Sequence, residues 1–291
     1  MPIDAAKALA AEPRSGEITW DRKDVQLYHL GIGAGARPDK HSPATDPDEL
    51  RYTLESRLHV LPSFATVAGA GAPGVIAGLS LPGIEVDLAR VLHGGQSLTL
   101  HRPVPATGTA TATGRIAAIY DKGTAAVLVM RTEVTDADGP LWTNDAQIFL
   151  RGEGGFGGDR GPSARLAPPH GEPDSTVERP LREDQALLYR LSGDWNPLHA
   201  DPEFARLAGF ERPILHGLCT YGVTLKAVVD TLLGGDVTRV RSYATRFAGV
   251  AYPGETLRIR MWRQDGAIRA AVSAVERDDA PVLADTVVQC G

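Results

Sequence analysis

The fragment ILHGLCTYGVTLKAVVDTLLGG, residues 214–235, has the pattern of one long buried helix. Pro213 fits a first helical turn, where its missing N–H would have no partner, and Gly234 and Gly235 provide a stop. Apolar residues recur on successive turns over most of the circumference, which is typical of a helix enclosed on all sides. They are Ile214, Leu215, Leu218, Val223, Leu225, Val228, Val229 and Leu232.

Segments on either side of this helix have the pattern of antiparallel strands, because they alternate or are rich in β-branched residues and are separated by turn residues. The C-terminal segments are 255–262, 267–276 and 281–289, and the N-terminal ones are 96–104, 110–121, 124–134 and 145–152. Residues 61–78 are the weaker N-terminal counterpart of the helix. The pattern predicts an α+β architecture in which an antiparallel sheet wraps a central helix, built twice.

An internal duplication is indicated by fragments that recur in the same order. LYHL at 27–30 matches LYRL at 188–191, VLPSF at 60–64 matches ILHGL at 214–218, and GQSL at 95–98 matches GETL at 254–257. Glycine and proline crowd the stretch between the copies, which is typical of an exposed connector. We expect a first repeat over 1–152, a linker over 153–178 and a second repeat over 179–291.

Composition excludes several classes of function. A chain of 291 residues with 43% hydrophobic content can fill a substantial core, and its net charge of −6 does not indicate binding to nucleic acid or to an anionic membrane. No apolar run is long enough to span a bilayer, so we expect a cytoplasmic protein. Cys219 and Cys290 lack metal-ligand spacing, and both are expected to be reduced.

The loop LSGDWNPLHA, residues 191–200, combines Asp194 and His199 around Pro197. Pro197 disfavours a regular helix, and a tight loop can turn both side chains into one cleft. A carboxylate and an imidazole that share one water can remove a proton from it and give one to carbon, without a metal. The alternative is a surface turn, since Asp, Asn, Gly and Pro are common turn residues. Asp201 is the better cap candidate for the short helix that follows.

Gly217 lies near the start of the expected helix. A glycine there exposes an unpaired backbone N–H at the positive end of the helix dipole, where it could bind the oxygen of a carbonyl. Close packing is the alternative role for Gly217, and a hydrogen-bonded, partly buried histidine is the alternative role for His216. Together with Asp194 and His199, these features favour addition of water to a conjugated thioester, or its reverse.

The segment YRLSGDWNPLHADPEFARLAGFERPILHGL, residues 189–218, resembles the signature of the type-2, (R)-specific enoyl-CoA hydratases, which are MaoC-like proteins of hot-dog fold. VQLYHLGIGAG, DELRYTLES, LPSFATVAG and RGEGGFGG resemble the N-terminal half and linker of the double hot-dog members. The positions in register are Tyr189, Ser192, Gly193, Asp194, Asn196, Pro197, His199, Asp201, Pro202, Phe204, His216 and Gly217.

The resemblance implies that Asp194 and His199 activate water for syn hydration, that the Gly217 N–H binds the thioester oxygen, and that Asn196 orients the site. In the first copy the corresponding stretch, LGIGAGARP at 30–38, has neither Asp nor His. Only the second copy is therefore expected to be catalytic. The first is expected to make room for a long or bulky acyl group, with the loop at 68–80 compatible with a wide pocket.

Three functions remain open from the sequence. The leading one is an enoyl-CoA hydratase that forms a (3R)-3-hydroxyacyl-CoA in β-oxidation, with a fatty or, by resemblance to actinobacterial relatives, a steroid side-chain acyl group. The alternatives are a (3R)-hydroxyacyl-carrier-protein dehydratase and a non-catalytic subunit that binds acyl thioesters.

The expected partners follow from the leading function. The substrate is an acyl-CoA thioester, no separate cofactor is needed because CoA is part of the substrate, and the family implies a homodimer. Candidate substrate-binding residues are Lys226, Arg246 and His216, with Arg241 as a further candidate for phosphate contact.

Overall fold

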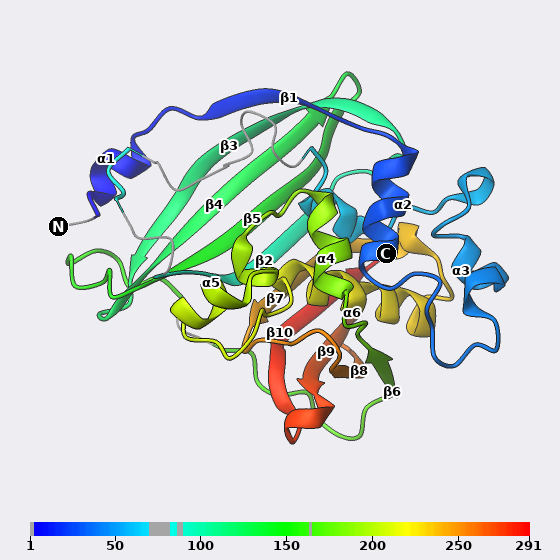
Figure 1. The fold of residues 1–291 in the computed structure, drawn as a ribbon. Helices are drawn as coiled ribbons and strands as arrows, with labels where there is room; N and C mark the ends of the chain where they lie inside the picture. The colour runs from blue at the N-terminus through cyan, green and yellow to red at the C-terminus, as the bar shows by residue number, and fades with distance from the viewer. Residues whose placement is uncertain (1–2, 70–81, 86–89, 163–164) are drawn as a thin grey trace.

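The computed structural model describes residues 3–69, 82–85, 90–162 and 165–291, and these form one curved antiparallel sheet of ten strands (Figure 1). The order across the sheet is β1-β3-β4-β5-β2-β7-β10-β9-β8-β6. In the first half the strands are β1 (Arg14–Trp20), β2 (Val91–Leu100), β3 (Gly108–Asp121), β4 (Ala125–Asp136) and β5 (Gly139–Arg151). In the second half they are β6 (Ser175–Pro180), β7 (Val240–Phe247), β8 (Thr256–Gln264), β9 (Ala267–Ala274) and β10 (Ala280–Cys290).

The sheet order confirms the duplication. Each half, counted from its outer edge, places its strands in the order first, third, fourth, fifth, second. The halves meet where β2 pairs with β7, from Gly95 opposite Arg246 to Thr99 opposite Ser242. The α+β double hot-dog class is therefore correct, and its two five-stranded sheets join edge to edge.

Two of the three matched pairs of fragments lie at equivalent positions in the two halves. LYHL lies in α2 (Arg22–Gly31) and LYRL begins in α4 (Gln185–Tyr189), where the rings of Tyr28 and Tyr189 are 6.0 Å apart. The third match was wrong. GQSL lies in β2, whereas GETL leads into β8, which is the counterpart of β3.

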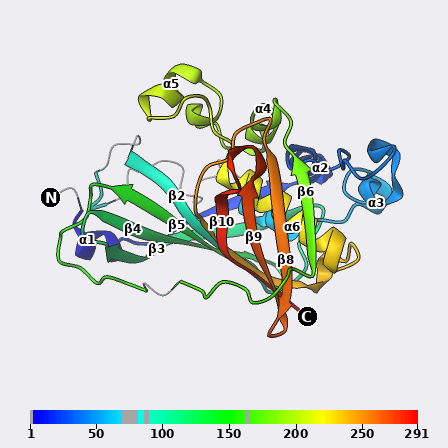
Figure 2. The same ribbon diagram turned by 90° about the horizontal axis from the view of Figure 1, so that it is seen from below.

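The central helix of the second half is α6 (Gly217–Leu232), which lies in the concave side of the sheet (Figure 2). Stacked rings fasten it to β7, with Tyr221 and Tyr243 3.9 Å apart and each hydroxyl donating to the other residue's carbonyl. Its start differs from the expected one. Leu215 donates its N–H to Ala251 O, so the chain is still extended there, and Pro213 precedes the helix.

The first half has no comparable helix among the described residues. The expected helix over 61–78 is instead a short 3-10 helix, Pro62–Thr66, and its residues 70–78 lie outside the described ranges. Gly69 contributes to the early end, because its φ of +71° is left-handed and a Cβ there would lie 2.4 Å from Ile18 Cβ. The described residues therefore place no long helix on the concave face of the first half.

Shorter elements connect and cover the sheet. They are α1 (Ala5–Leu9), α3 (Pro47–Leu50) and α5 (Pro202–Leu207), and α5 lies at the margin of the molecule in Figure 2. β6 begins at Ser175, inside the expected linker over 153–178, so the second half starts earlier than expected. Across the described ranges, no helix is both long enough and apolar enough to cross a membrane.

Candidate active site

The loop between α4 and α5 is a sequence of tight turns. Gly193, with φ of +114°, ends a 3-10 turn, and Pro197 begins the next one, Pro197–His199. Within the loop, Asp194 Oδ1 accepts from the Asn196 N–H at 3.2 Å, and Asn196 Oδ1 accepts from the Leu198 N–H at 3.0 Å. The Asn196 N–H therefore fixes the direction of the Asp194 carboxylate, and the Asn196 side chain caps the turn that leads to His199.

Asp194 and His199 converge in this loop, although Asp194 is exposed and His199 is only 9% exposed. One polar side-chain atom of each, together with one ring nitrogen of His216, lie within 4.8 Å of one another. The His199 Nδ1 lies 2.8 Å from Ile214 O, and a carbonyl can only accept, so Nδ1 carries the proton. Burial lowers the pKa of His199, which keeps its Nε2 as an unprotonated base.

Gly217 is the first residue of α6, and no hydrogen bond within the described part of the chain has its N–H as donor. The ring of Phe247 closes one side, since a Cβ on Gly217 would lie 3.1 Å from Phe247 Cε1. A helix of 16 residues points its positive end at this N–H. The arrangement gives an anion-binding donor next to an acid/base pair.

His216 contacts both Asp194 and His199. Its ring stacks on that of His199 with centroids 3.8 Å apart, and its Nε2 donates to Asp194 O at 3.2 Å. Burial and the neighbouring His199 lower the pKa of His216 to about 3, so it stays uncharged. At 1% exposure it is out of reach of substrate, and its assignment as a substrate-binding residue was wrong.

Comparison with known proteins shows the family to which the chain belongs. Residues 165–282 match the MaoC like domain, and residues 18–152 match the MFE-2 hydratase 2 N-terminal domain. The chain belongs to the MaoC-like family.

Two curated MaoC-like relatives and one solved structure match nearly the whole chain. Enoyl-CoA hydratase ChsH3 of Mycobacterium tuberculosis is 49% identical over 284 residues, which cover 97% of both chains. The peroxisomal enoyl-CoA hydratase 2 of Arabidopsis thaliana is 40% identical over 270 residues, covering 87% of this chain and 85% of that one. The crystal structure of a MaoC-like dehydratase from Phytophthora capsici superposes with a TM-score of 0.86 at 30% identity, covering 99% and 98%.

The cluster of Asp194, His199 and His216 has metal-binding residue types, but its geometry favours acid/base chemistry. A metal lies in the plane of every imidazole that binds it, about 2.0–2.1 Å from the nitrogen. The rings of His199 and His216 are stacked, with planes 30° apart, so their lone pairs do not meet at one point at that distance.

The MaoC-like site also uses residues that sequence reasoning missed. His93 on β2 packs its ring 4.8 Å from that of Phe247 on β7, and Phe247 in turn lies against Gly217. Burial lowers the pKa of His93 to about 4. The signal available was a histidine followed by two glycines at the start of a strand. Its relation to the catalytic loop depends on the β2–β7 pairing, which the sequence does not show.

A cavity of about 330 Å³ opens beside this site on the concave face of the first half. Leu218, the residue after Gly217, forms part of its wall, and His93 lies where the cavity approaches Phe247. Side chains from β1 to β5 and from residues 65, 66 and 68 form the rest of the wall, and most of them are apolar. Among the described residues, no long helix lies over this face of the first half.

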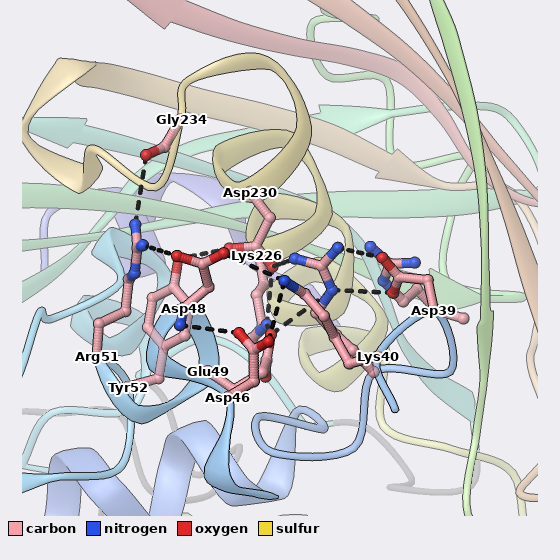
Figure 3. A network of polar contacts seen from close by, with 12 residues as sticks. Asp39, Lys40, Asp46, Asp48, Glu49, Arg51, Tyr52, Lys226, Asp230 and Gly234 are labelled. Carbon is pink, nitrogen blue, oxygen red and sulfur yellow. Dashed lines mark hydrogen bonds and ion pairs between the residues drawn. The ribbon is translucent and has the colours of Figure 1, made fainter. Parts of the chain in front are cut away.

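Lys226 was wrongly assigned to substrate binding. It lies in the middle of α6, 4% exposed, and its Nζ donates to Glu49 Oε1 at 2.7 Å and Asp230 Oδ2 at 2.8 Å (Figure 3). Tyr52 completes the cluster by donating its hydroxyl to Asp230. The ammonium group therefore belongs to a buried ion cluster.

Arg246 was also wrongly assigned. It precedes Phe247 on β7, so its side chain points to the opposite face of the sheet, where its Nε donates to Asp285 Oδ2 at 2.7 Å. Arg241 lies at the far end of β7, beyond the C-terminal end of α6 and away from Gly217. Neither guanidinium group faces the catalytic loop.

Proposed function

We propose that this MaoC-like protein is an enoyl-CoA hydratase, which adds water to a 2-trans-enoyl-CoA to give a (3R)-3-hydroxyacyl-CoA. The observation that carries the proposal is the convergence of Asp194 and His199 next to the N–H of Gly217, which donates no hydrogen bond to any described residue. The names of the two curated relatives agree with it. The (3R) configuration follows from the resemblance to (R)-specific hydratases.

The chemistry follows from the three groups. The thioester oxygen binds to the Gly217 N–H, which withdraws electrons from the conjugated double bond and stabilises the enolate that forms. A water held between Asp194 and His199 Nε2 loses a proton to the pair as its oxygen bonds to C3. The pair then returns a proton to C2, so the net change is the addition of one water.

The acyl chain is proposed to extend from C3 into the cavity of the first half. This cavity begins beside Leu218 and has about 330 Å³, so the site can take a long or bulky acyl group. A helix in this place, as in the second half, would fill the same space. The first half thus serves binding and the second half serves catalysis.

The direct test is hydration by the purified protein. Mixed with a 2-trans-enoyl-CoA, the protein should remove the ultraviolet absorbance of the conjugated thioester, and the product should be the (3R) alcohol by chiral analysis. The same acyl group on a carrier protein should react more slowly. Binding without turnover across chain lengths would favour a non-catalytic subunit, and a preference for the carrier would favour a dehydratase of acyl-chain synthesis.

We further propose that the reaction needs no metal or separate cofactor and that the protein is a homodimer. Dialysis against EDTA should leave the hydration rate unchanged, because Asp194 and His199 themselves handle the proton. Multi-angle light scattering tests the dimer through the mass of the particle. A mass near 30.9 kDa would indicate a monomer.

A further inference from the structure

The floor of the cavity carries a row of polar side chains across three strands. They are Gln96 on β2, Asn144 on β5 and Thr132 on β4, and all three line the cavity. Thr132 lies directly opposite Asn144 in the β4–β5 register. From the other side, Gln96 Nε2 donates to Asn144 Oδ1 at 3.2 Å. The row is therefore continuous across the middle of the floor.

Apolar side chains flank this row along the strands. On one side the same strands place Ala146 and Met130, and on the other side Trp142 and Val134. A chain that enters beside Gly217 and runs along the strands must pass over the polar row. Groups with unmet hydrogen-bonding capacity in such a place determine what the cavity accepts.

The orientation of each amide in the row is fixed. Ala65 O, which can only accept, receives Asn144 Nδ2 at 2.8 Å, so Asn144 Oδ1 turns toward Gln96. Gln96 Oε1 in turn lies 3.1 Å from His93 Nε2 and accepts a hydrogen bond from it. The chain of bonds thus runs from the catalytic end of the cavity to the 3-10 helix, and it holds Asn144 rigidly.

The row still has hydrogen-bonding capacity toward the cavity. Asn144 uses one N–H on Ala65, and no hydrogen bond of the described residues involves its second N–H or the Thr132 hydroxyl. Both residues are partly buried. A hydrocarbon chain over them would remove them from water without replacing its hydrogen bonds, whereas an oxygen atom would replace them.

We propose that the acyl group of the preferred substrate carries an oxygen substituent, a hydroxyl or a carbonyl, that bonds to Asn144 and Thr132. This inference rests on the proposed hydratase function and names its substrate class, enoyl thioesters of oxygenated acyl groups. A site built to bond an oxygen discriminates against the analogue that lacks it, because its own polar groups are then left unpaired.

The test compares 2-trans-enoyl-CoAs of one chain length, either unsubstituted or with a single hydroxyl or keto group at successive carbons beyond C4. At one or more positions the oxygenated substrate should have a kcat/KM about tenfold or more above that of the unsubstituted chain. The unsubstituted chain reacting best against every positional isomer would overturn the inference. Hydration without an oxygen preference refutes only this inference, and absence of hydration across the panel refutes both proposals.

Variants of Thr132 distinguish recognition of the substrate oxygen from a general loss of activity. Thr132→Val keeps the shape and removes the hydroxyl, so it should lower kcat/KM for the preferred oxygenated substrate and raise it for the unsubstituted chain. Thr132→Ser should restore the preference. Thr111→Val, the same change at an exposed position on the outer face of β3, is the matched control and should alter neither value. A parallel loss for both substrates in Thr132→Val would contradict the role.

Discussion

At the scale of single residues, the site depends on imidazoles that stay uncharged. His199 keeps a free Nε2 because its Nδ1 is tied to Ile214 O, and His216 stacks on it without adding charge. Two stacked imidazolium rings would repel each other and would leave no base for the water. Burial therefore sets the protonation state on which the chemistry depends.

Gly217 should tolerate no side chain. A Cβ there would lie 3.1–3.3 Å from three ring atoms of Phe247 and would occupy the approach to the N–H. We expect Gly217→Ala to lower kcat/KM at least tenfold, toward the roughly 100-fold loss typical when an oxyanion donor is removed. The free energy of unfolding should change by less than about 1 kcal/mol. Steady-state kinetics and thermal unfolding check both, and full activity would show that the thioester oxygen binds elsewhere.

His29 makes the fold sensitive to acid. It is fully buried, its Nδ1 lies 2.7 Å from Tyr52 O, and its Nε2 accepts from the Leu61 N–H, so only the neutral ring satisfies both bonds. Burial lowers its pKa from 6.5 to about 3. Because the unfolded state takes up this proton first, the stability that His29 provides is complete above about pH 6.5 and is lost as pH falls toward 3.

The measurement is the free energy of unfolding as a function of pH. Between about pH 6 and 4, His29→Asn should reduce the slope by up to about 1.4 kcal/mol per pH unit, the value for one proton. Asn can keep one of the two bonds, so the variant should still fold. An unchanged slope would mean that His29 is already protonated in the native state or is accessible to water.

At the scale of elements, α6 connects the catalytic loop to the first half. Lys226 on α6 binds Glu49 from α3, and the two carboxylates that it neutralises are 1% and 4% exposed. Removing one partner of a buried ion cluster leaves charge unpaired, which typically destabilises by about 3–5 kcal/mol. The cluster therefore holds the catalytic helix against the other repeat.

Lys226→Met should lower the free energy of unfolding by up to about that amount, since Met fills the space but leaves Glu49 and Asp230 only the ion pairs with Arg37, at 3.7 and 3.6 Å. Lys23→Met, the same change at an exposed position of α2, should have an effect within about 0.5 kcal/mol. Chemical denaturation of both variants checks the difference. Equal stabilities would mean that water reaches the cluster.

The elements also show how far a sequence can be interpreted. The body of α6 was predictable because its apolar residues are periodic, but its start was not, since it depends on Leu215 pairing with Ala251, far along the chain. The strand β7 was missed because polar and small residues interrupt its apolar ones. Lys226 was predicted to bind substrate, because its ion-pair partner Glu49 lies 177 residues away in the sequence.

The candidate site likewise contains residues that the sequence predicts and residues that it does not. Asp194, His199 and Gly217 come from one continuous signature, so the sequence could propose them together. His93 and Phe247 come from different repeats and meet only through the pairing of β2 with β7. Residues that share a site through sheet pairing carry no local signal, and this explains why His93 and Phe247 were missed.

At the scale of the whole molecule, the two halves that arose by duplication have different roles. The second copy keeps the helix and the loop that carry the acid/base groups, and the first copy has a cavity where the helix would lie. The pairing of β2 with β7 joins the two halves into one surface. A substrate can therefore have its thioester in one half and its acyl chain in the other.

A larger side chain in the cavity should therefore reduce the length of acyl chain that the site accepts. Ala146 lines the cavity from the middle of β5, and Ala146→Phe places a ring in the path of the acyl chain. We expect kcat/KM for a long-chain enoyl-CoA to fall at least tenfold relative to that for 2-butenoyl-CoA. A chain-length series checks this. An unchanged ratio would place the acyl chain outside the cavity.

The most direct measurement of the central claim is the hydration rate of a 2-trans-enoyl-CoA by Asp194→Asn. The amide keeps the shape but cannot take the proton from water, so we predict a loss of kcat of about 10²-fold or more with an unchanged melting temperature. Asp201→Asn, in the same loop, makes the same chemical change at a helix cap, where Asn serves as well as Asp, and should stay active. Full activity of Asp194→Asn would contradict the account.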